Sequence, residues 1–310
     1  MPELAELGPV EVAAIRELVA QRYSLFLGEP HERYIGTRVS ERLKELSLSF
    51  SQYLEALRTS PDQGGELRNL VERFLCIYET RFMRDPPDFR ALACFILPQL
   101  AREMRRTGRT RLRVASAGCS TGQEVYTLAM ILDEARPEIG DAHVEVVGLD
   151  LSTEALEKAR RGRYGVRDIA VLDPWRQQRY FRSCGGDEVE VVPSLREKVH
   201  FTQANLAVEL PITQVDVIFC RNVLIYFNPV LRQEVIRLLL SALRLGGYIV
   251  VGSADSLWSF KDILRTMRTS GTIVFQRIKA VPAQAPPPPV LSTPSSDASQ
   301  IANPAGGAGR

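Results

Sequence analysis

The chain has 310 residues, of which 45% are hydrophobic, enough to bury a large core and to form a second, smaller domain. Its formal net charge of +2 excludes the basic stripe expected of a nucleic-acid-binding protein. It has no apolar run of about 18 residues that would span a membrane, and the acidic start MPELAELGPV lacks the basic and apolar regions of a signal peptide.

The first quarter of the chain is predicted to be helical. Apolar residues recur at spacings of three and four, as on one face of a helix, in four stretches: Val10–Tyr23, Thr37–Leu46, Phe50–Leu57 and Glu66–Cys76. Arg38 and Arg42 lie on one face of the second stretch. A solvated face and a surface that binds an acidic partner are both open interpretations of these arginines.

The segment Arg111–Leu132 predicts a strand, a tight turn and a helix. An apolar run enters a turn in which Gly118 and Gly122 bracket small residues, and an amphipathic helix begins near Gln123. An α/β sheet presents nucleotide-like ligands at such a turn, because glycine lets the backbone approach the ligand closely. A turn that binds no ligand is the alternative.

The ligand at this turn is not expected to be a dinucleotide. The two glycines are four residues apart, so the G-x-G-x-x-G pattern that holds a pyrophosphate is absent. Glu124 stands in the first helical turn, where its carboxylate would repel a phosphate. S-adenosylmethionine suits such an acid better, since it carries a sulfonium, an amino group and a ribose diol.

A second strand, His143–Leu149, is expected to end at Asp150. Ligands of α/β sheets bind outside the strand ends, where an ionised aspartate can accept two hydrogen bonds from a ribose diol. An N-cap for the next helix is the alternative role. Ser152 is better placed for that cap, which leaves Asp150 available to a ligand.

A third strand, Val217–Cys220, reads as buried and parallel, and polar residues follow it directly. Asn222 can both donate and accept a hydrogen bond from a substrate. Tyr226 is either a packed aromatic or part of the same site. A helix at 231–243 and a strand at 246–252 continue the parallel pattern, and a last strand, Thr272–Ile278, is expected to close the sheet edge.

The remaining sequence adds no second chemistry. Five cysteines without a CxxC pair predict reduced thiols, mostly in the core, in a cytoplasmic protein, although Cys119 lies in the glycine turn and can be exposed. Three scattered histidines give no metal motif, so no metal is expected. The glycines at 185 and 186 predict a hairpin turn within residues 173–196.

Five motifs, taken together and in order, resemble the CheR family: IYETRFMRDPPDF, SAGCSTGQEVYTLAM, GLDLSTEAL, HFTQANL and FCRNVLIYF. Members of this family are S-adenosylmethionine-dependent protein-glutamate O-methyltransferases that act on chemotaxis receptors. The resemblance runs from about residue 10 to 280. It implies an α/β fold, with a Rossmann-like class I methyltransferase sheet, an N-terminal all-helical domain and a small inserted antiparallel β-subdomain.

The resemblance also implies four parts of the chain. They are an N-terminal helical, receptor-recognition domain at residues 1–76, a linker at 77–90, a catalytic domain that binds S-adenosylmethionine at 91–280, and a tail at 281–310. The β-subdomain is the insertion at 173–196. The tail is rich in proline, serine and glycine and is expected to be disordered.

Carried over by position, the resemblance implies a set of site residues. The catalytic residues are Arg84, Asn222 and Tyr226, and the residues that bind the cofactor are Thr80, Arg84, Gly118, Glu124, Asp150, Asn205, Leu206, Asn222 and Val223. The chain departs from the family pattern in three places: Phe82-Met83 replaces a pair of aromatics, Gln123-Glu124 replaces a pair of acids, and Val125 replaces the proline that follows them. The ribose or sulfonium role of those acids therefore falls to Glu124.

The expected reaction needs neither a metal nor a general base. The nucleophile is a substrate glutamate, which is ionised at neutral pH because its reference pKa is about 4.3. Arg84 is the best residue to steer that carboxylate, unless a salt bridge with Asp85 or Asp88 occupies it. A scaffold that senses S-adenosylmethionine without turnover and a methyltransferase for a small molecule or RNA are the alternative functions.

The implied partner is the cytoplasmic domain of a methyl-accepting chemotaxis receptor, with no nucleic acid and no membrane insertion. Some family members hold a receptor's C-terminal pentapeptide by adding it as a strand to the β-subdomain. The turn at 185–187 is shorter here than in those members. We therefore expect the pentapeptide tether not to be used.

Overall fold

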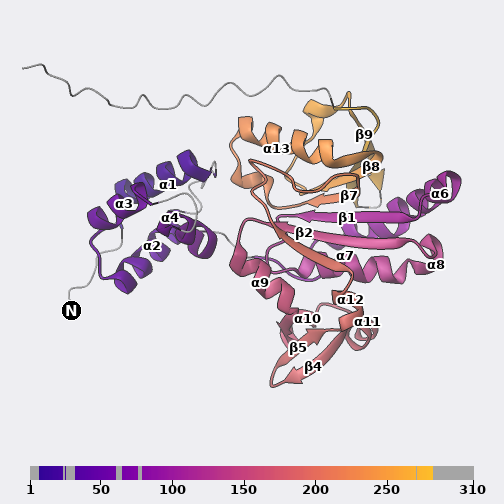
Figure 1. Ribbon diagram of the computed structural model, residues 1–310, viewed down its shortest axis with the longest axis horizontal. Helices are drawn as coiled ribbons and strands as arrows, with labels where there is room; N and C mark the ends of the chain where they lie inside the picture. The colour runs from indigo at the N-terminus through magenta and orange to yellow at the C-terminus, as the bar shows by residue number, and fades with distance from the viewer. Residues whose placement is uncertain are drawn as a thin grey trace, which may run out of the picture.

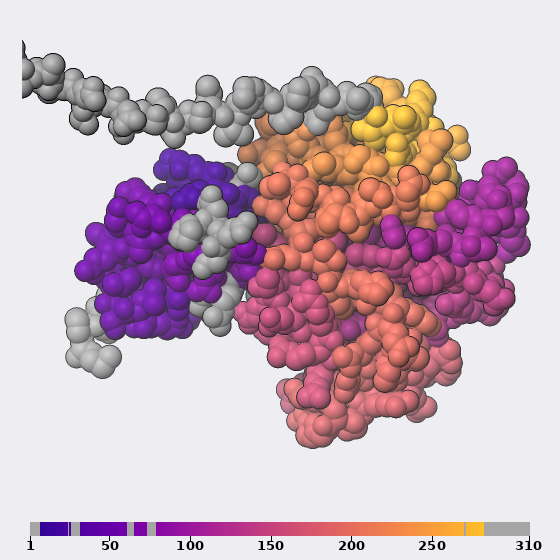
Figure 2. All heavy atoms as spheres, in the orientation of Figure 1, coloured from indigo at the N-terminus to yellow at the C-terminus, as the bar shows by residue number. Residues whose placement is uncertain are grey.

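The computed structural model describes residues 7–23, 25, 32–60, 65–75, 79–269 and 271–281. Within them a seven-stranded sheet carries helices on both faces, a three-stranded antiparallel sheet projects from one side, and a group of helices precedes both (Figure 1). In the space-filling view the N-terminal helices form a lobe beside the α/β unit (Figure 2). The expected fold class is confirmed, whereas the predicted disordered tail lies almost wholly outside the described residues.

The N-terminal helices are α1 (Pro9–Tyr23), α2 (Glu32–Leu46), α3 (Phe50–Arg58) and α4 (Glu66–Asn69), which continues as the π-helix η2 (Leu70–Leu75). They pack around their own apolar cluster, which includes Ile15, Val39 and Tyr53. A capping box at Ser49 and Gln52 starts α3. Four helical segments were expected here and are confirmed, although Cys76 lies outside the described residues.

Neither interpretation of Arg42 on helix α2 is right. Its Nε and Nη2 donate to the two oxygens of Glu66 at 2.7 and 2.8 Å, and the hydroxyl of Tyr53 donates to the same carboxylate at 2.9 Å. The Arg42 side chain therefore ties α2 to α4 and is no free surface. Arg38 fits the solvated alternative better, since it is 41% exposed and pairs with Glu41 on its own helix.

The large sheet has the strand order β6-β2-β1-β7-β8-β10-β9. The bounds are β1 Arg111–Ala117, β2 His143–Asp150, β6 Val199–Gln203, β7 Val215–Cys220, β8 Leu243–Val251, β9 Leu264–Thr269 and β10 Thr272–Arg277. All pairings from β6 to β8 are parallel, and β10 runs antiparallel between β8 and β9. From β1 the chain builds β2 and β6 on one side of the sheet and then crosses to build β7 and β8 on the other side. The carboxyl ends of β1, β2 and β7 therefore form the topological switch point, where ligands bind.

The expectation that Thr272–Ile278 closes the sheet is wrong. Strand β10 is an inner strand, and β9 forms the edge beyond it. The sequence of β9 is LRTMRT, and most of its side chains are exposed or half-buried. Its apolar pattern is therefore too weak to identify it as a strand, and its cationic side chains suit an edge that must not pair further.

Two apolar clusters cover the two faces of this sheet. The helices and short turns around it are α5 Pro86–Ala91, η3 Leu92–Ile96, α6 Leu97–Thr107, α7 Gln123–Glu134, α8 Arg136–Ile139, α9 Thr153–Arg161, α10 Val166–Ile169, α11 Pro174–Tyr180, α12 Pro193–Arg196, η4 Leu224–Tyr226, α13 Pro229–Ala242 and η5 Trp258–Phe260. Helix α7 was expected to be amphipathic, but it is buried on all sides, because Gln123 and all of Val125–Leu132 are buried. It packs against the sheet and is covered by α12 on another side.

The small sheet has the order β3-β5-β4, with β3 at Arg163–Gly165, β4 at Phe181–Gly185 and β5 at Glu188–Val191. The hairpin predicted within residues 173–196 is confirmed as β4 and β5, and Gly185 and Gly186 both have positive φ in its turn. Phe82, on the connector before α5, is fully buried against this unit. Its ring meets those of Tyr164 and Phe181 edge to face at 4.9 and 5.4 Å.

The described cysteines differ in how far they are buried. Cys119 is buried, although its place in the glycine turn allowed exposure, and of the four cysteines that the structure describes, Cys94 and Cys184 are exposed. Cys220 is buried in β7. Among the helices that the structure describes, none is long and apolar enough to cross a membrane.

We predict that Phe82→Ala lowers the free energy of unfolding by about 3–5 kcal/mol, since it removes a fully buried ring between two others. Urea denaturation followed by circular dichroism measures this loss. Val230→Ala is the control, because Val230 is 76% exposed and its loss is expected to change stability by less than about 0.5 kcal/mol. Equal effects of the two substitutions would contradict the packing role of Phe82.

Candidate active site

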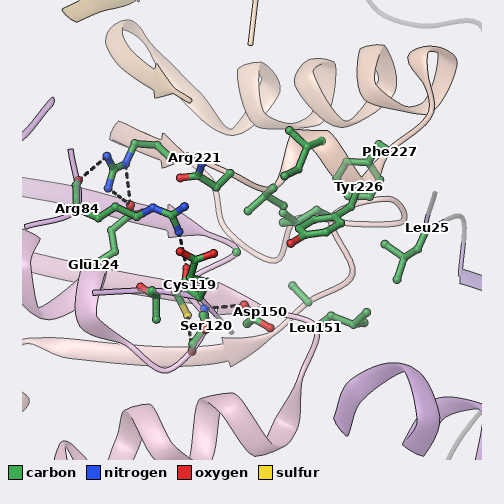
Figure 3. Close-up of a pocket in the computed structure, with 18 of the residues that line it drawn as sticks. Leu25, Arg84, Cys119, Ser120, Glu124, Asp150, Leu151, Arg221, Tyr226 and Phe227 are labelled. Atoms are coloured by element: carbon green, nitrogen blue, oxygen red, sulfur yellow. Dashed lines mark hydrogen bonds and ion pairs between the residues drawn. The ribbon is translucent and has the colours of Figure 1, made fainter. Parts of the chain in front are cut away.

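A cavity of about 290 Å³ lies at the carboxyl ends of β1, β2 and β7 (Figure 3). Its wall comes from the connector before α5, from the turns after these strands and after β6, and from Leu25 of the N-terminal region. All ten site residues expected from the sequence line this cavity: Thr80, Arg84, Gly118, Glu124, Asp150, Asn205, Leu206, Asn222, Val223 and Tyr226. Segments that are far apart in the chain are thus brought together here.

The turn after β1 has no room for a side chain at Gly118. A Cβ placed there would lie 2.2 Å from Cγ2 of Val223, and the residue has a φ of +81°. The amides of Gly118 and Cys119 both donate to the carbonyl of Leu149, at 2.7 and 2.9 Å. The turn is therefore fixed to the end of β2 and opens its backbone toward the cavity.

Asp150 is held rigidly at the end of β2. One carboxylate oxygen accepts the amide of Ser120 at 2.7 Å, and the other accepts the amide of Ser152 at 2.9 Å. Ser152 is itself the N-cap of α9, so the alternative role of Asp150 as that cap is wrong. Burial raises the pKa of Asp150, and the backbone amides of Ser152 and Ser120 oppose part of that rise. Each oxygen keeps a lone pair for a further donor.

The sequence analysis assigned the charged end of the glycine turn to Glu124 by itself, but in the structure this carboxylate has two partners. One of its oxygens accepts the hydroxyl of Ser116 at 2.8 Å, and the other accepts Nε and Nη2 of Arg221, both at 2.9 Å. The side chain of Arg221 is only 2% exposed. Burial alone would lower the pKa of Arg221, but Glu124 and Asp88 outweigh burial and raise it.

Arg221 is the site residue that sequence reasoning missed. The sequence pattern identifies it only as the polar end of β7, although a charged residue directly after the fully buried run VDVIFC needs a buried partner. Its Nη1 donates to the Asp88 carboxylate at 2.8 Å and to the Arg84 carbonyl at 2.7 Å. The ring of Phe89 lies 4.8 Å from the guanidinium.

This cluster settles the alternative for Arg84. Asp85 and Asp88, the expected salt-bridge partners of Arg84, both pair with Arg221 instead. The Arg84 guanidinium donates to the carbonyl of Glu79, and no carboxylate of the described chain pairs with it. The salt-bridge alternative is therefore wrong, and Arg84 lines the cavity without an ion-pair partner among the described residues (Figure 3).

The lip formed after β7 carries the last site residues. Asn222 has a φ of +58°, a conformation that asparagine tolerates better than most residues. Leu224, which begins the short helix η4, and Phe227, which directly follows that helix, are buried. Tyr226, the last residue of η4, is half-buried and lines the cavity. Leu224 and Phe227 thus supply the packing that was the alternative role of Tyr226.

The parallel sheet, its glycine turn and the acid at the end of its second strand define a Rossmann-like, nucleotide-binding class of α/β protein. Within that class, the family model described as "CheR methyltransferase, SAM binding domain" matches residues 78–273. The chain therefore belongs to the CheR methyltransferase family, and it is an S-adenosylmethionine-dependent methyltransferase.

Curated relatives cover most of the chain. Chemotaxis protein methyltransferase 1 of Pseudomonas aeruginosa is 30% identical over 84% of this chain and 95% of its own length. The Cher2 chemotaxis protein methyltransferase of Pseudomonas putida is 30% identical over 87% of this chain and 98% of its own. A chemotaxis protein methyltransferase of Borreliella burgdorferi is 29% identical over 82% and 90%.

The residues of the cavity fit this cofactor. The Oγ of Ser120 is buried with no hydrogen-bond partner among the residues that the structure describes, as expected of a group that meets a ligand. The carboxylate of Asp150 suits a diol, and the side chains of Leu151, Leu206 and Val223 offer apolar contact for a base. The lining of the cavity thus matches a ligand that has ribose hydroxyls at one place and a flat aromatic base at another.

We predict that Gly118→Ala weakens binding of S-adenosylhomocysteine by about tenfold or more, because the new methyl group displaces Val223 and the positive φ is strained. Isothermal titration calorimetry measures the affinity. The double variant Gly118→Ala, Val223→Ala should recover part of it, since the clashing methyl groups are gone.

Gly140→Ala is the matched control. Gly140 also has a positive φ, +64°, but a Cβ there meets nothing within 4 Å. It should lower the free energy of unfolding by about 1–3 kcal/mol through backbone strain and leave the affinity unchanged. Wild-type affinity in Gly118→Ala would mean that the turn after β1 does not contact the cofactor.

Proposed function

We propose that this protein transfers the methyl group of S-adenosylmethionine to glutamate side chains of a chemoreceptor-type signalling protein in the cytoplasm. The product is a glutamate methyl ester, the modification used for adaptation. One observation carries the proposal: a single cavity has a carboxylate floor at Asp150 and Glu124 and an arginine, Arg84, with no carboxylate partner in the described chain.

The floor residues are proposed to hold the cofactor. Asp150 accepts the ribose hydroxyls with the lone pairs that its two backbone donors leave free. Asn205 and Leu206 lie beside the adenine, and Thr80 and the backbone at Gly118 face the remainder. Glu124 supplies negative charge near the sulfonium. The bound group contributes an electrophilic methyl carbon on a positively charged sulfur.

The chain's own residues then have to align the substrate. The glutamate carboxylate is already ionised, since its reference pKa is about 4.3, and needs no base. Arg84 orients it through its planar fork of donors, and Asn222 and Tyr226 complete the approach from the opposite lip. Alignment of this kind contributes on the order of 7–11 kcal/mol to catalysis.

The alternative functions have less support. A sensing scaffold would not need Arg84, Asn222 and Tyr226 on the same cavity as the cofactor residues. A methyltransferase for RNA would need a basic surface, which a net charge of +2 does not supply. The relatives are chemotaxis protein methyltransferases, which favours a receptor over a small molecule.

Two accessory parts complete the proposal. The helical domain, residues 1–76, presents the receptor's methylation region to the cavity, and Leu25 of this region lines the cavity itself. The β4–β5 hairpin turns through Gly186 and Asp187 alone, so we propose that it holds no receptor pentapeptide.

The test of the activity is transfer of tritiated methyl groups to a membrane fraction that contains the receptor. We expect label that is released by mild base, because methyl esters hydrolyse there and methylated nucleic acids do not. Replacement of the receptor glutamates by alanine should abolish it. Label that resists base, or no label from a protein that binds S-adenosylhomocysteine, would contradict the proposal.

The roles of Arg84 and Asp150 are separable. Arg84→Ala should lower turnover about a hundredfold and change cofactor affinity much less, since the arginine aims the substrate. Asp150→Ala should weaken S-adenosylhomocysteine binding about tenfold or more, because charged hydrogen bonds are lost. Single-turnover assays and calorimetry give the two quantities, with the exposed Arg90→Ala as control. Equal losses in both measurements for Arg84→Ala would refute its assigned role.

A further inference from the structure

Arg221 connects two parts of the cavity, the part assigned to the cofactor and the part assigned to the substrate. These assignments rest on the function proposed above. On one side its Nε and Nη2 grip one oxygen of Glu124, a cofactor residue, at 2.9 Å. On the other side its Nη1 holds the carbonyl of Arg84 at 2.7 Å and the carboxylate of Asp88 at 2.8 Å. A single planar group therefore spans the floor and the connector.

Other contacts fix the connector on either side of Arg84, at the buried ring of Phe82 and at the carbonyl of Asp85, which accepts the Asp88 amide at 3.1 Å. Met83 and Asp85, which flank it, both have positive φ, of 52° and 57°, so the backbone bends sharply on either side of the arginine. The Met83 amide donates to the Thr127 hydroxyl at 3.2 Å. The bond from Arg221 to the Arg84 carbonyl is the contact that fixes the bend at the arginine itself.

The position of Glu124 depends on the same guanidinium. Its two oxygens are divided between the Ser116 hydroxyl and Arg221, which leaves its carboxylate one orientation toward the cavity. The side chains of Glu124 and Asp88 are only 12% and 10% exposed. Without the cation, two buried carboxylates would face each other with no charge between them.

Stability alone does not explain such a cluster. Taking one cation and two carboxylates out of water costs several kcal/mol per ion, and apolar residues of similar volume often stabilise a fold as well or better. A lysine keeps the charge but has no fork that can reach two acids in different directions. The geometry thus favours placement over stability as the reason for an arginine.

We propose that Arg221 is a positioning residue that fixes Glu124 and the main chain of Arg84 in one frame. The cofactor's sulfonium and the incoming carboxylate are then aligned by the same buried guanidinium. Arg221 touches neither reactant in this proposal and acts through the two residues that do.

The central test is Arg221→Lys, measured by calorimetry with S-adenosylhomocysteine and by receptor methylation. We expect a folded protein whose affinity falls about tenfold and whose turnover falls about a hundredfold. In an Arg84→Ala background the same substitution should cost less turnover than in the wild type, because only its path through Glu124 remains. Losses that multiply in the double variant, or a single variant with wild-type behaviour, would overturn the proposal.

Arg109→Lys is the matched control. Arg109 is also an arginine with little exposure, 13%, that bridges two acids, Glu103 and Asp216, but it lies at the amino end of β7, away from the cavity. It should lower thermal stability and leave cofactor affinity and turnover unchanged. The same functional losses in Arg109→Lys would show that loss of any buried ion cluster suffices, which sinks the proposal.

Asp88→Asn serves if Arg221→Lys does not fold. It removes the negative charge beside the connector, keeps the oxygen that accepts the Thr272 hydroxyl at 2.6 Å, and leaves the Glu124 pair intact. We expect turnover to fall with little change in cofactor affinity, and equal falls in both would overturn the proposal. If the wild-type protein methylates no receptor, the proposed function fails, yet calorimetry on Arg221→Lys still tests the contact with Glu124.

Discussion

The buried guanidinium of Arg221 is the interaction on which the cavity depends. It lies directly after β7, where the carboxyl ends of three parallel strands converge, and it contacts the connector, helix α7 and α5. Removing one partner of a buried ion cluster typically costs about 3–5 kcal/mol, since the others remain charged and unpaired. The sheet supplies the location, but this cluster decides how the connector lies against it.

The cavity combines two electrostatic demands that oppose each other. A sulfonium cofactor calls for carboxylates, and a carboxylate substrate calls for a cation, so the two sets must be close without neutralising each other. Here Glu124 and Asp150 are both tied by fixed donors, and Arg84 is held by a carbonyl, which takes no charge from it. The acids and the arginine can therefore face one cavity without collapsing into a salt bridge.

Asp150 and Asn222 could be predicted from the sequence pattern, because they lie at or just after the ends of the buried strands β2 and β7. Thr80 and Arg84 follow no strand, so only the resemblance to the CheR family indicated them. The sequence pattern fails where an element has no apolar periodicity, as in the edge strand β9. It also fails where burial comes from distant segments, as at helix α7 and Cys119. The partners of Arg221 belong to two segments more than ninety residues away, and no local pattern reports that pairing.

The contrast between the two arginines explains why one is structural and the other is proposed to act. All three guanidinium nitrogens of Arg221 contact carboxylates inside the protein, and its side chain is only 2% exposed. It can therefore orient neighbouring residues but cannot bind a substrate carboxylate. Within the described chain the side chain of Arg84 makes one hydrogen bond, to a neutral carbonyl, and its other donors are available to a ligand. An arginine that the fold has already neutralised cannot grip a substrate carboxylate. The acids at 85 and 88 pair with Arg221 and so leave Arg84 without a carboxylate partner in the described chain, which is what its proposed role requires.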